Sequence, residues 1–253
     1  MKEKIYTLPV NDAFRRNDRD CPLCVLEESL NTQMLDYYLG PSLMEPDVRK
    51  STNDLGFCRQ HALALVAREN NRLGLGLMLH THLASVSSAV GHTLSEAEIR
   101  PRKGLSGRQK DFRDKLRQSA DGIRKQAENC VICNRLADTM ARYLDVICWQ
   151  FANEEGFRDT FRATHHFCLP HLADLLDGAA NHLDQNSSAA FIDDLRGVAA
   201  RSLGAMERDI EWFTLKFDYR NSDKPWGDSK DAVLRTIRTL TGGTEPEKQD
   251  LQK

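Results

Sequence analysis

The sequence lacks the features that would place it outside the cytoplasm or on a nucleic acid. Its first 25 residues carry charges throughout and contain no apolar run of the signal-peptide type, which predicts a cytoplasmic protein. The net charge of −2 provides no global basic field, so a nucleic-acid partner would need a local patch. No segment shows the two-residue alternation of a β-strand, which predicts an all-α protein.

Motifs that would assign a reaction are also missing. The chain has no Walker motif, no nucleophile–base–acid set at an interpretable spacing and no His-Glu-x-x-His sequence. We therefore assign no catalytic residue from the sequence, and it leaves open whether the protein is an enzyme.

One long segment, residues 73–95, contains no Asp, Glu, Lys or Arg. Its leucines are diluted by Gly, Ser, Thr and His residues, so hydrocarbon would be a poor solvent for it. We expect a helix buried in the protein and no membrane span.

Six of the seven cysteines and two of the eight histidines follow one pattern that occurs twice. The first set is Cys-x2-Cys-x33-Cys-x2-His and the second is Cys-x2-Cys-x34-Cys-x2-His, with the members Cys21, Cys24, Cys58 and His61, then Cys130, Cys133, Cys168 and His171. Because thiols stay reduced in the cytoplasm, the pattern favours metal or redox chemistry over disulfides.

Each set supplies three thiolates and one imidazole, the donors of a closed tetrahedral zinc site. The sequence thus predicts two structural zinc ions in a protein with a binding or regulatory role. Two alternatives stay open: iron–sulfur clusters, and redox dithiols at the two Cys-x2-Cys pairs in a protein of anaerobic metabolism. Ligands could be exchanged between the sets, but the short loops and the repeat favour closure of each site within its own set.

The surroundings of the two sets repeat as well, and they predict a pair of helical modules. Each Cys-x2-Cys begins a helix, a polar crossing follows, and each Cys-x2-His begins another helix. The ligands would lie at helix N-termini, where the helix dipole stabilises thiolates. We expect modules at residues 1–95 and 129–217, a charged linker and helix at 96–128, a C-terminal segment at 218–253, and packing of the long helices into one bundle.

Two other segments are candidate surfaces for binding a partner. The linker should form a loop at Pro101–Gly107 and then a solvated helix with Phe112, Leu116 and Ile123 facing inward; its alternating charges argue against nucleic acid. Residues 218–228, with Tyr219, Arg220 and Trp226, could contact an unknown protein or small molecule, or dock as a tail over the helices.

The remaining thiol and several histidines are expected to be structural. Cys148 aligns with Leu39 in the repeat, which predicts a buried core cysteine. His165 and His166 have no counterpart in the first module and are expected in a loop. His80 and His82 point to nearly opposite sides of one helix, so they cannot face one ion, and one of them should be hydrogen-bonded.

The blocks Cys21-Pro22-Leu23-Cys24, Gly56-Phe57-Cys58-Arg59-Gln60-His61, the segment 71–79 and the segment 216–221 resemble an uncharacterised bacterial family. Its members come mainly from anaerobic Gram-positive bacteria and form a domain of unknown function. The resemblance spans nearly the whole chain. It implies a cytoplasmic metal-binding protein, and it implies no reaction, substrate or catalytic residue.

Overall fold

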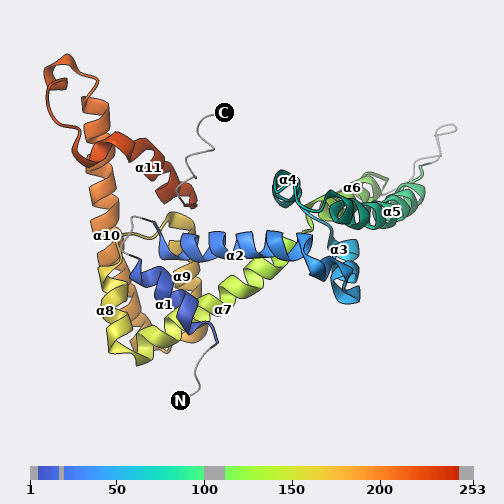
Figure 1. Cartoon of the computed structure of the whole chain (residues 1–253), viewed down its shortest axis with the longest axis horizontal. Helices are drawn as coiled ribbons and strands as arrows, with labels where there is room; N and C mark the ends of the chain where they lie inside the picture. Colours follow the sequence, from blue (N-terminus) through green and yellow to red (C-terminus); the bar gives the residue numbers. More distant parts are fainter. Residues whose placement is uncertain (1–4, 17–19, 100–111, 245–253) are drawn as a thin grey trace. The chain divides into compact units, whose positions relative to one another are not determined.

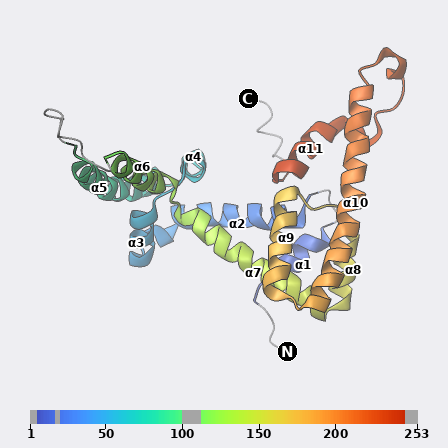
Figure 2. The ribbon, with the colours of Figure 1, turned by 180° about the vertical axis from the view of Figure 1, so that it is seen from behind.

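The computed structural model describes residues 5–16, 20–99 and 112–244, and it is built from helices (Figure 1; Figure 2). The described residues are 83% helical and contain no strand, which confirms the predicted all-α class. The expected loop at Pro101–Gly107 lies outside these residues.

Eleven α-helices and three 3-10 helices follow one another in the described residues. The α-helices are α1 (Thr7–Arg15), α2 (Pro22–Leu39), α3 (Pro46–Leu55), α4 (Arg59–Ala67), α5 (Arg72–Glu96), α6 (Phe112–Glu128), α7 (Val131–Asn153), α8 (Glu155–Ala163), α9 (Leu169–His182), α10 (Gln185–Leu215) and α11 (Ala232–Thr241). The 3-10 helices are η1 (Pro41–Met44), η2 (Tyr219–Asn221) and η3 (Gly227–Asp231).

The chain divides into two compact units. Unit 1 contains residues 1–30 and 138–253, and unit 2 contains residues 31–137, so the division falls inside α2 and inside α7. The boundaries predicted at residues 95, 128 and 217 divide the chain by repeat and remain a prediction.

An aromatic cluster forms the core of unit 1. The rings of neighbouring members lie 4.8–6.2 Å apart, mostly tilted or edge to face, with Phe14 and Phe161 stacked. The cluster consists of Phe14, Phe151, Phe157, Phe161, Phe167 and Phe191. Because Phe167 is fully buried and directly precedes Cys168, the core fixes the position of that thiol.

The core of unit 2 brings the end of α2 against the start of α7. Tyr38 of α2 is fully buried, and its ring lies 5.8 Å from that of Phe57, edge to face. Gly56 has φ +63°, a conformation that favours glycine, and its carbonyl accepts a 3.0 Å hydrogen bond from the N–H of Val131. Phe57 and Gly56 therefore place Cys58 beside the first turn of α7.

Helix α5 differs from its expected burial. In the most apolar stretch of α5, only 17% of the residues are buried. Leu75 and Met78 are buried, whereas Leu73 and Leu83 are exposed. Of the two histidines considered, His82 is the hydrogen-bonded one: its Nδ1 lies 2.7 Å from the Asn53 carbonyl oxygen. The prediction of a buried helix was wrong because hydropathy does not show which faces the chain itself covers.

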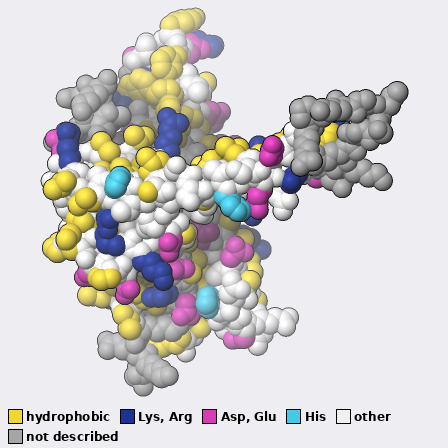
Figure 3. Space-filling model, turned by 90° about the vertical axis from the view of Figure 1, so that its right-hand side faces the viewer, with side chains coloured by type: hydrophobic (Ala, Val, Ile, Leu, Met, Phe, Trp, Pro, Cys, Tyr) yellow, Lys and Arg dark blue, Asp and Glu magenta, His cyan; other side chains and the backbone are white. Residues whose placement is uncertain are grey.

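Helix α6 forms where the linker helix was expected. Phe112 and Ile123 are partly covered, but Leu116 is 44% exposed, so its inward orientation is not confirmed. Arg117 pairs with Asp114 and Arg124 with Asp121, which leaves the charge of this surface mixed. Figure 3 shows Lys and Arg interspersed with Asp and Glu on the face that it displays.

The C-terminal segment of unit 1 folds back onto α10. The Lys216 ammonium donates hydrogen bonds to the carbonyls of Asn221 and Ser222, and Trp226 packs against Phe213 and Phe217. Residues 218–228 thus dock in part as the tail that was one of the two expectations. Helix α11 then packs against α10 and α9, which carries the chain back toward the start of α9.

Candidate metal centres

The first centre, site 1, consists of Cys21, Cys24, Cys168 and His171 and lies within unit 1. His171 Nδ1 lies 3.6 Å from the Cys21 sulfur, 3.3 Å from that of Cys24 and 3.1 Å from that of Cys168. The sulfurs of Cys24 and Cys168 are 3.6 Å apart. All four residues are buried, and their ligand atoms lie within 4.8 Å of one another.

The second centre, site 2, consists of Cys58, His61, Cys130 and Cys133 and lies within unit 2. His61 Nδ1 lies 3.3 Å from each of the three sulfurs. The sulfurs of Cys58 and Cys133 are 3.8 Å apart. The eight residues that the sequence singles out thus meet in two groups of four.

The grouping corrects the expectation that each set closes on itself. Each centre combines the Cys-x2-Cys of one module with the Cys-x2-His of the other. After α2 and α3 the chain returns to the middle of α2, where His61 meets Asn31, seven residues or about 10 Å beyond Cys24. There the hydrogen bond from the Val131 N–H to the Gly56 carbonyl places Cys58 at the start of α7, so the nearest Cys-x2-Cys is that of the other module.

Helix starts position the ligands in both centres. Cys58 and Cys168 are the N-cap residues of α4 and α9, and both have an extended backbone. His61 and His171 follow in the first turn, three residues later, so each histidine shares a face with the cysteine that precedes its helix. The unpaired N–H groups and the dipole of a helix start stabilise thiolate charge there.

A polar group outside each centre orients its histidine. In site 2, His61 Nε2 lies 3.2 Å from Asn31 Oδ1, an oxygen that can only accept, so Nε2 donates and Nδ1 is free to bind an ion. In site 1, His171 Nε2 lies 3.7 Å from a Glu27 oxygen and 4.0 Å from an Asp174 oxygen. Outer partners of this kind fix the tautomer of metal-binding histidines.

The packed donors of site 1 shift one another's pKa values. Burial would raise the pKa of Cys21, but contacts with Cys168, Cys24 and His171 hold it well below its usual value. Burial would lower the pKa of His171, but contacts with Cys168 and Cys21 raise it to about 10. Contacts with Cys168 and Cys21 raise the pKa of Cys24. Site 1 without an ion therefore holds a thiolate beside an imidazolium and keeps other protons that an ion would displace.

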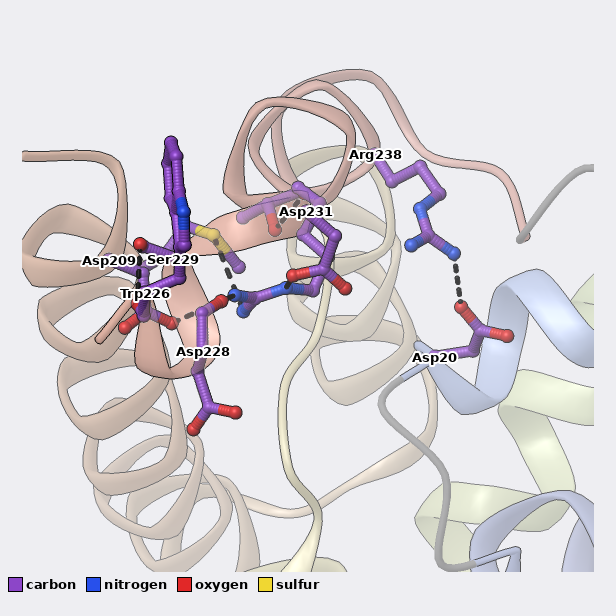
Figure 4. A network of polar contacts seen from close by, with 10 residues as sticks. Asp20, Asp209, Trp226, Asp228, Ser229, Asp231 and Arg238 are labelled. Carbon is purple, nitrogen blue, oxygen red and sulfur yellow. Dashed lines mark hydrogen bonds and ion pairs between the residues drawn. The ribbon is translucent and has the colours of Figure 1, made fainter. Parts of the chain in front are cut away.

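The two centres differ in how far the rest of the chain shields them from solvent. Over site 1, the N–H of Gly243 lies 3.2 Å from the Cys24 sulfur, and Gly242 lies next to Cys168. Arg238 of α11 holds this segment through a 2.9 Å ion pair with Asp20 (Figure 4). In site 2, Cys58 is half-buried and Cys133 is exposed. Burial and its sulfur neighbours raise the pKa of Cys133 to about 12.

The other candidate residues stay outside both centres. Cys148 is completely buried, as predicted, and lies against Gly178. His165 and His166 lie in the loop before Cys168, as expected, and line a cavity of about 280 Å³ together with Asp20, Arg235 and Arg238. Burial lowers the pKa of His166.

Sequence reasoning missed the residues that support the ligands. Asn31, Glu27 and Gly243 carry no motif of their own, and their distance along the chain from the histidine or thiol they contact gives no signal. Asn31 and Glu27 lie four residues apart on α2, a spacing that places two residues on one face of a helix.

Fold and centres together define an all-α protein with two Cys3His clusters, each arranged so that it could hold a metal ion. The chain belongs to a family of unknown function, DUF6062, whose model matches residues 1–247. No curated protein and no solved structure matches the chain. Membership in this family agrees with the resemblance that the Cys-x2-Cys and Phe-Cys-x2-His blocks indicate. It assigns no reaction to the protein.

Proposed function

We propose that the protein binds two zinc ions, one in each centre, and that both ions are structural. The observation that carries this proposal is the spacing of the donor atoms. Two sulfurs bound to one zinc ion lie about 3.8 Å apart, and a sulfur and a nitrogen about 3.5 Å. The sulfur pairs at 3.6 and 3.8 Å and the sulfur–nitrogen pairs at 3.1–3.6 Å agree with these edges of a tetrahedron.

The same spacing favours a single ion over an iron–sulfur cluster. In a cluster, ligands bind different iron atoms and lie farther apart than two bonds to one ion allow. All four donor atoms of each centre lie within 4.8 Å of one another, and the individual pairs at 3.1–3.8 Å are close enough for two bonds to one ion. Three thiolates with one imidazole and no spare donor are a structural zinc set.

A structural role follows from the number of protein ligands. Four donors close a tetrahedron and leave no position for a water molecule, so neither ion would activate water or polarise a substrate. The ion in site 1 would tie the start of α2 to the start of α9. The ion in site 2 would tie the start of α4 to the start of α7. Each ion would thus do what core packing does elsewhere, because it would hold together two helix starts that are far apart in sequence.

The proposed location is the cytoplasm, and the proposed role is binding or regulation. All seven cysteines are free thiols, which suits a reducing compartment and donors held ready for an ion. A scaffold with closed metal sites acts through its surface, so the partner would be a protein or a small molecule that contacts the helices.

The test is elemental analysis of protein purified anaerobically and without added metal, together with its visible absorption spectrum. We expect about two zinc ions per chain and no colour. Cys148→Ser is the matched control, because this cysteine is buried outside both centres, and it should keep both ions. Iron with sulfide and a broad band near roughly 400 nm would contradict the proposal.

A further inference from the structure

Helix α5 exposes an apolar face that contains no charge. Arg72 and Glu96, its first and last residues, are its only charged residues. Between them, Leu73 is 77% exposed, Leu83 66% and Leu94 58%. Gly76, His80, Ser87 and the half-buried Val90 lie between these leucines, so the face is uncharged and joins apolar with small and polar residues. An exposed row of leucines of this size is often a functional surface.

The opposite face of α5 is the one that unit 2 covers. Arg49 of α3 donates hydrogen bonds to the Leu77 carbonyl and to Thr81, and the amide of Asn53 donates to Ser85. Helix α6 packs against α5 as well. These contacts fix the orientation of α5, so the open face is a consequence of folding and not of a loose helix.

The residues of the open face recur at alternating steps of three and four, as in a coiled-coil seam. The seam consists of Leu73, Gly76, His80, Leu83, Ser87, Val90 and Leu94. A Cβ atom added at Gly76 would meet nothing within 4 Å, and the same holds at Gly91, which flanks the seam. Small residues at such open positions allow a second helix to approach closely.

The geometry points to a second copy of this chain as the occupant, with two α5 helices packed antiparallel about a two-fold axis near Leu83 and Ala84. In this register Leu73 lies opposite the partner's Leu94, Gly76 opposite the partner's Gly91, and Leu83 opposite the partner's Ala84. His80 faces the partner's Ser87, two groups that can hydrogen-bond. Leu73, His80, Ser87 and Leu94 pair within the seam, and Gly76 and Leu83 pair with the flanking Gly91 and Ala84. These eight residues form one patch that pairs with itself, as a two-fold dimer requires.

Charge complementarity selects the antiparallel orientation. Antiparallel packing brings Arg72 next to the partner's Glu96 at both ends of the seam, and it opposes the two helix dipoles favourably. Parallel packing would place Arg72 beside the partner's Arg72 and Glu96 beside the partner's Glu96. The neutral seam between these ends adds no repulsion in either orientation, so the end charges decide.

The size of the face predicts a dimer that dissociates on dilution. Helix α5 has 25 residues and is about 37 Å long, and a stripe about 10 Å wide along it covers roughly 370 Å² per chain. This area belongs with weak and transient interfaces, which are smaller than the standard size of about 800 Å² per partner. We therefore expect dissociation in the micromolar range. The seam contains no residue of either metal centre.

The test is sedimentation velocity of the full chain between about 1 and 100 µM, a range that brackets micromolar dissociation constants. The wild type should shift from monomer to dimer. Leu83→Lys should weaken the dimer at least tenfold, and Gly76→Leu should weaken it similarly by blocking close approach. Neither variant should unfold the monomer, because Leu83 is exposed and the space at Gly76 is open.

Leu8→Lys is the matched control, since Leu8 of α1 is 70% exposed and lies outside the seam; it should leave the dimer unchanged. Arg72→Glu and Glu96→Arg should each weaken the dimer a few-fold, and the double variant should restore it, as only antiparallel packing allows. A wild type that stays monomeric overturns the proposal, as does a dimer that Leu83→Lys does not weaken. Recruitment of the monomer to phosphatidylcholine–phosphatidylglycerol vesicles through Leu83 would also overturn it.

Discussion

The two ligand histidines are oriented by chemically different partners. His61 contacts a neutral amide, Asn31, whereas His171 lies near the carboxylates of Glu27 and Asp174. A carboxylate partner makes the imidazole nitrogen a stronger ligand for a metal ion than an amide partner does. Losing such an outer partner typically lowers metal affinity tenfold to a hundredfold. The two centres should therefore respond separately to changes at these residues.

We predict that Asn31→Ala lowers the zinc affinity of site 2 by about tenfold to a hundredfold and leaves site 1 unchanged, because His61 loses the acceptor that fixes its tautomer. Competition with a chromophoric chelator measures both affinities in one titration. Glu27→Gln is the paired control and should affect site 1 only. An equal loss from both centres on Asn31→Ala would contradict this assignment.

The raised pKa of His171, about 10, gives the metal-free protein a pH dependence. A group whose pKa is raised on folding contributes stability that is full below its unfolded pKa, about 6.5, and is lost as pH rises through the folded value. The lowered pKa of Cys21 acts in the opposite direction and offsets this loss up to about pH 8.5, the usual pKa of a thiol, because the folded thiolate–imidazolium pair holds as many protons as the unfolded thiol and imidazole. Above this pH the raised pKa values of Cys24 and Cys133 add to the loss, since their neutral forms are favoured in the fold.

We therefore predict that the melting temperature of the metal-free protein changes little between about pH 7 and pH 8.5 and falls by several degrees between about pH 8.5 and pH 10. The zinc-loaded protein should not show this fall, because the ion requires thiolates and a neutral imidazole and binds better as protons are removed. Calorimetry of both forms measures the difference. A metal-free protein that gains stability over this range would show that the donor contacts of site 1 are wrong.

Helix starts are the elements that assemble both centres, and the sequence reveals them well. The four helices that begin at ligands could be predicted from the apolar spacing after each Cys-x2-Cys and Cys-x2-His, and all eight ligand residues could be named from the repeat. The sequence does not predict which Cys-x2-Cys meets which Cys-x2-His. Both sets have the same donors at the same offsets, so nothing in the spacing distinguishes closure within a module from exchange.

Helix α5 shows a second limit of the same kind. The absence of charge from residues 73–95 correctly indicates a helix and leads to the prediction that apolar surface covers it. It does not say whether that surface belongs to the same chain, because burial in a core and burial in an interface select the same residue types.

The segment after α11 covers site 1, and among the residues that the structure describes it has no counterpart at site 2. We predict that a chain ending at Thr241 releases zinc from site 1 several-fold faster, because the Gly243 N–H no longer reaches the Cys24 sulfur and Gly242 no longer lies against Cys168. Release into excess chelator, followed by absorbance, measures the rate. The rate from site 2 is the internal control, and an unchanged rate at site 1 would show that the segment has no protective role.

At the scale of the whole molecule, each compact unit contains one complete centre. Ligand exchange between the modules places all donors of site 1 in unit 1 and all donors of site 2 in unit 2. Because Cys133 is exposed while every ligand residue of site 1 is buried, solvent and chelators reach site 2 more easily. The two ions would therefore differ in kinetic accessibility although their donors are the same.

We predict biphasic zinc release from the wild type, with site 2 emptying first. Cys58→Ser should abolish the fast phase and Cys168→Ser the slow phase, each with loss of about one ion and a lower melting temperature. Loss of the slow phase in Cys58→Ser would reverse the assignment of accessibility.

The central claim is that each centre holds one ion through ligands from both modules, and the metal content of two double variants tests it most directly. Cys21→Ser with Cys168→Ser removes two ligands of site 1, so this variant should keep about one zinc ion per chain. Cys21→Ser with Cys58→Ser damages both centres and should keep none. The reverse result, one ion in the second variant and none in the first, would show that each module closes on itself and would contradict the account.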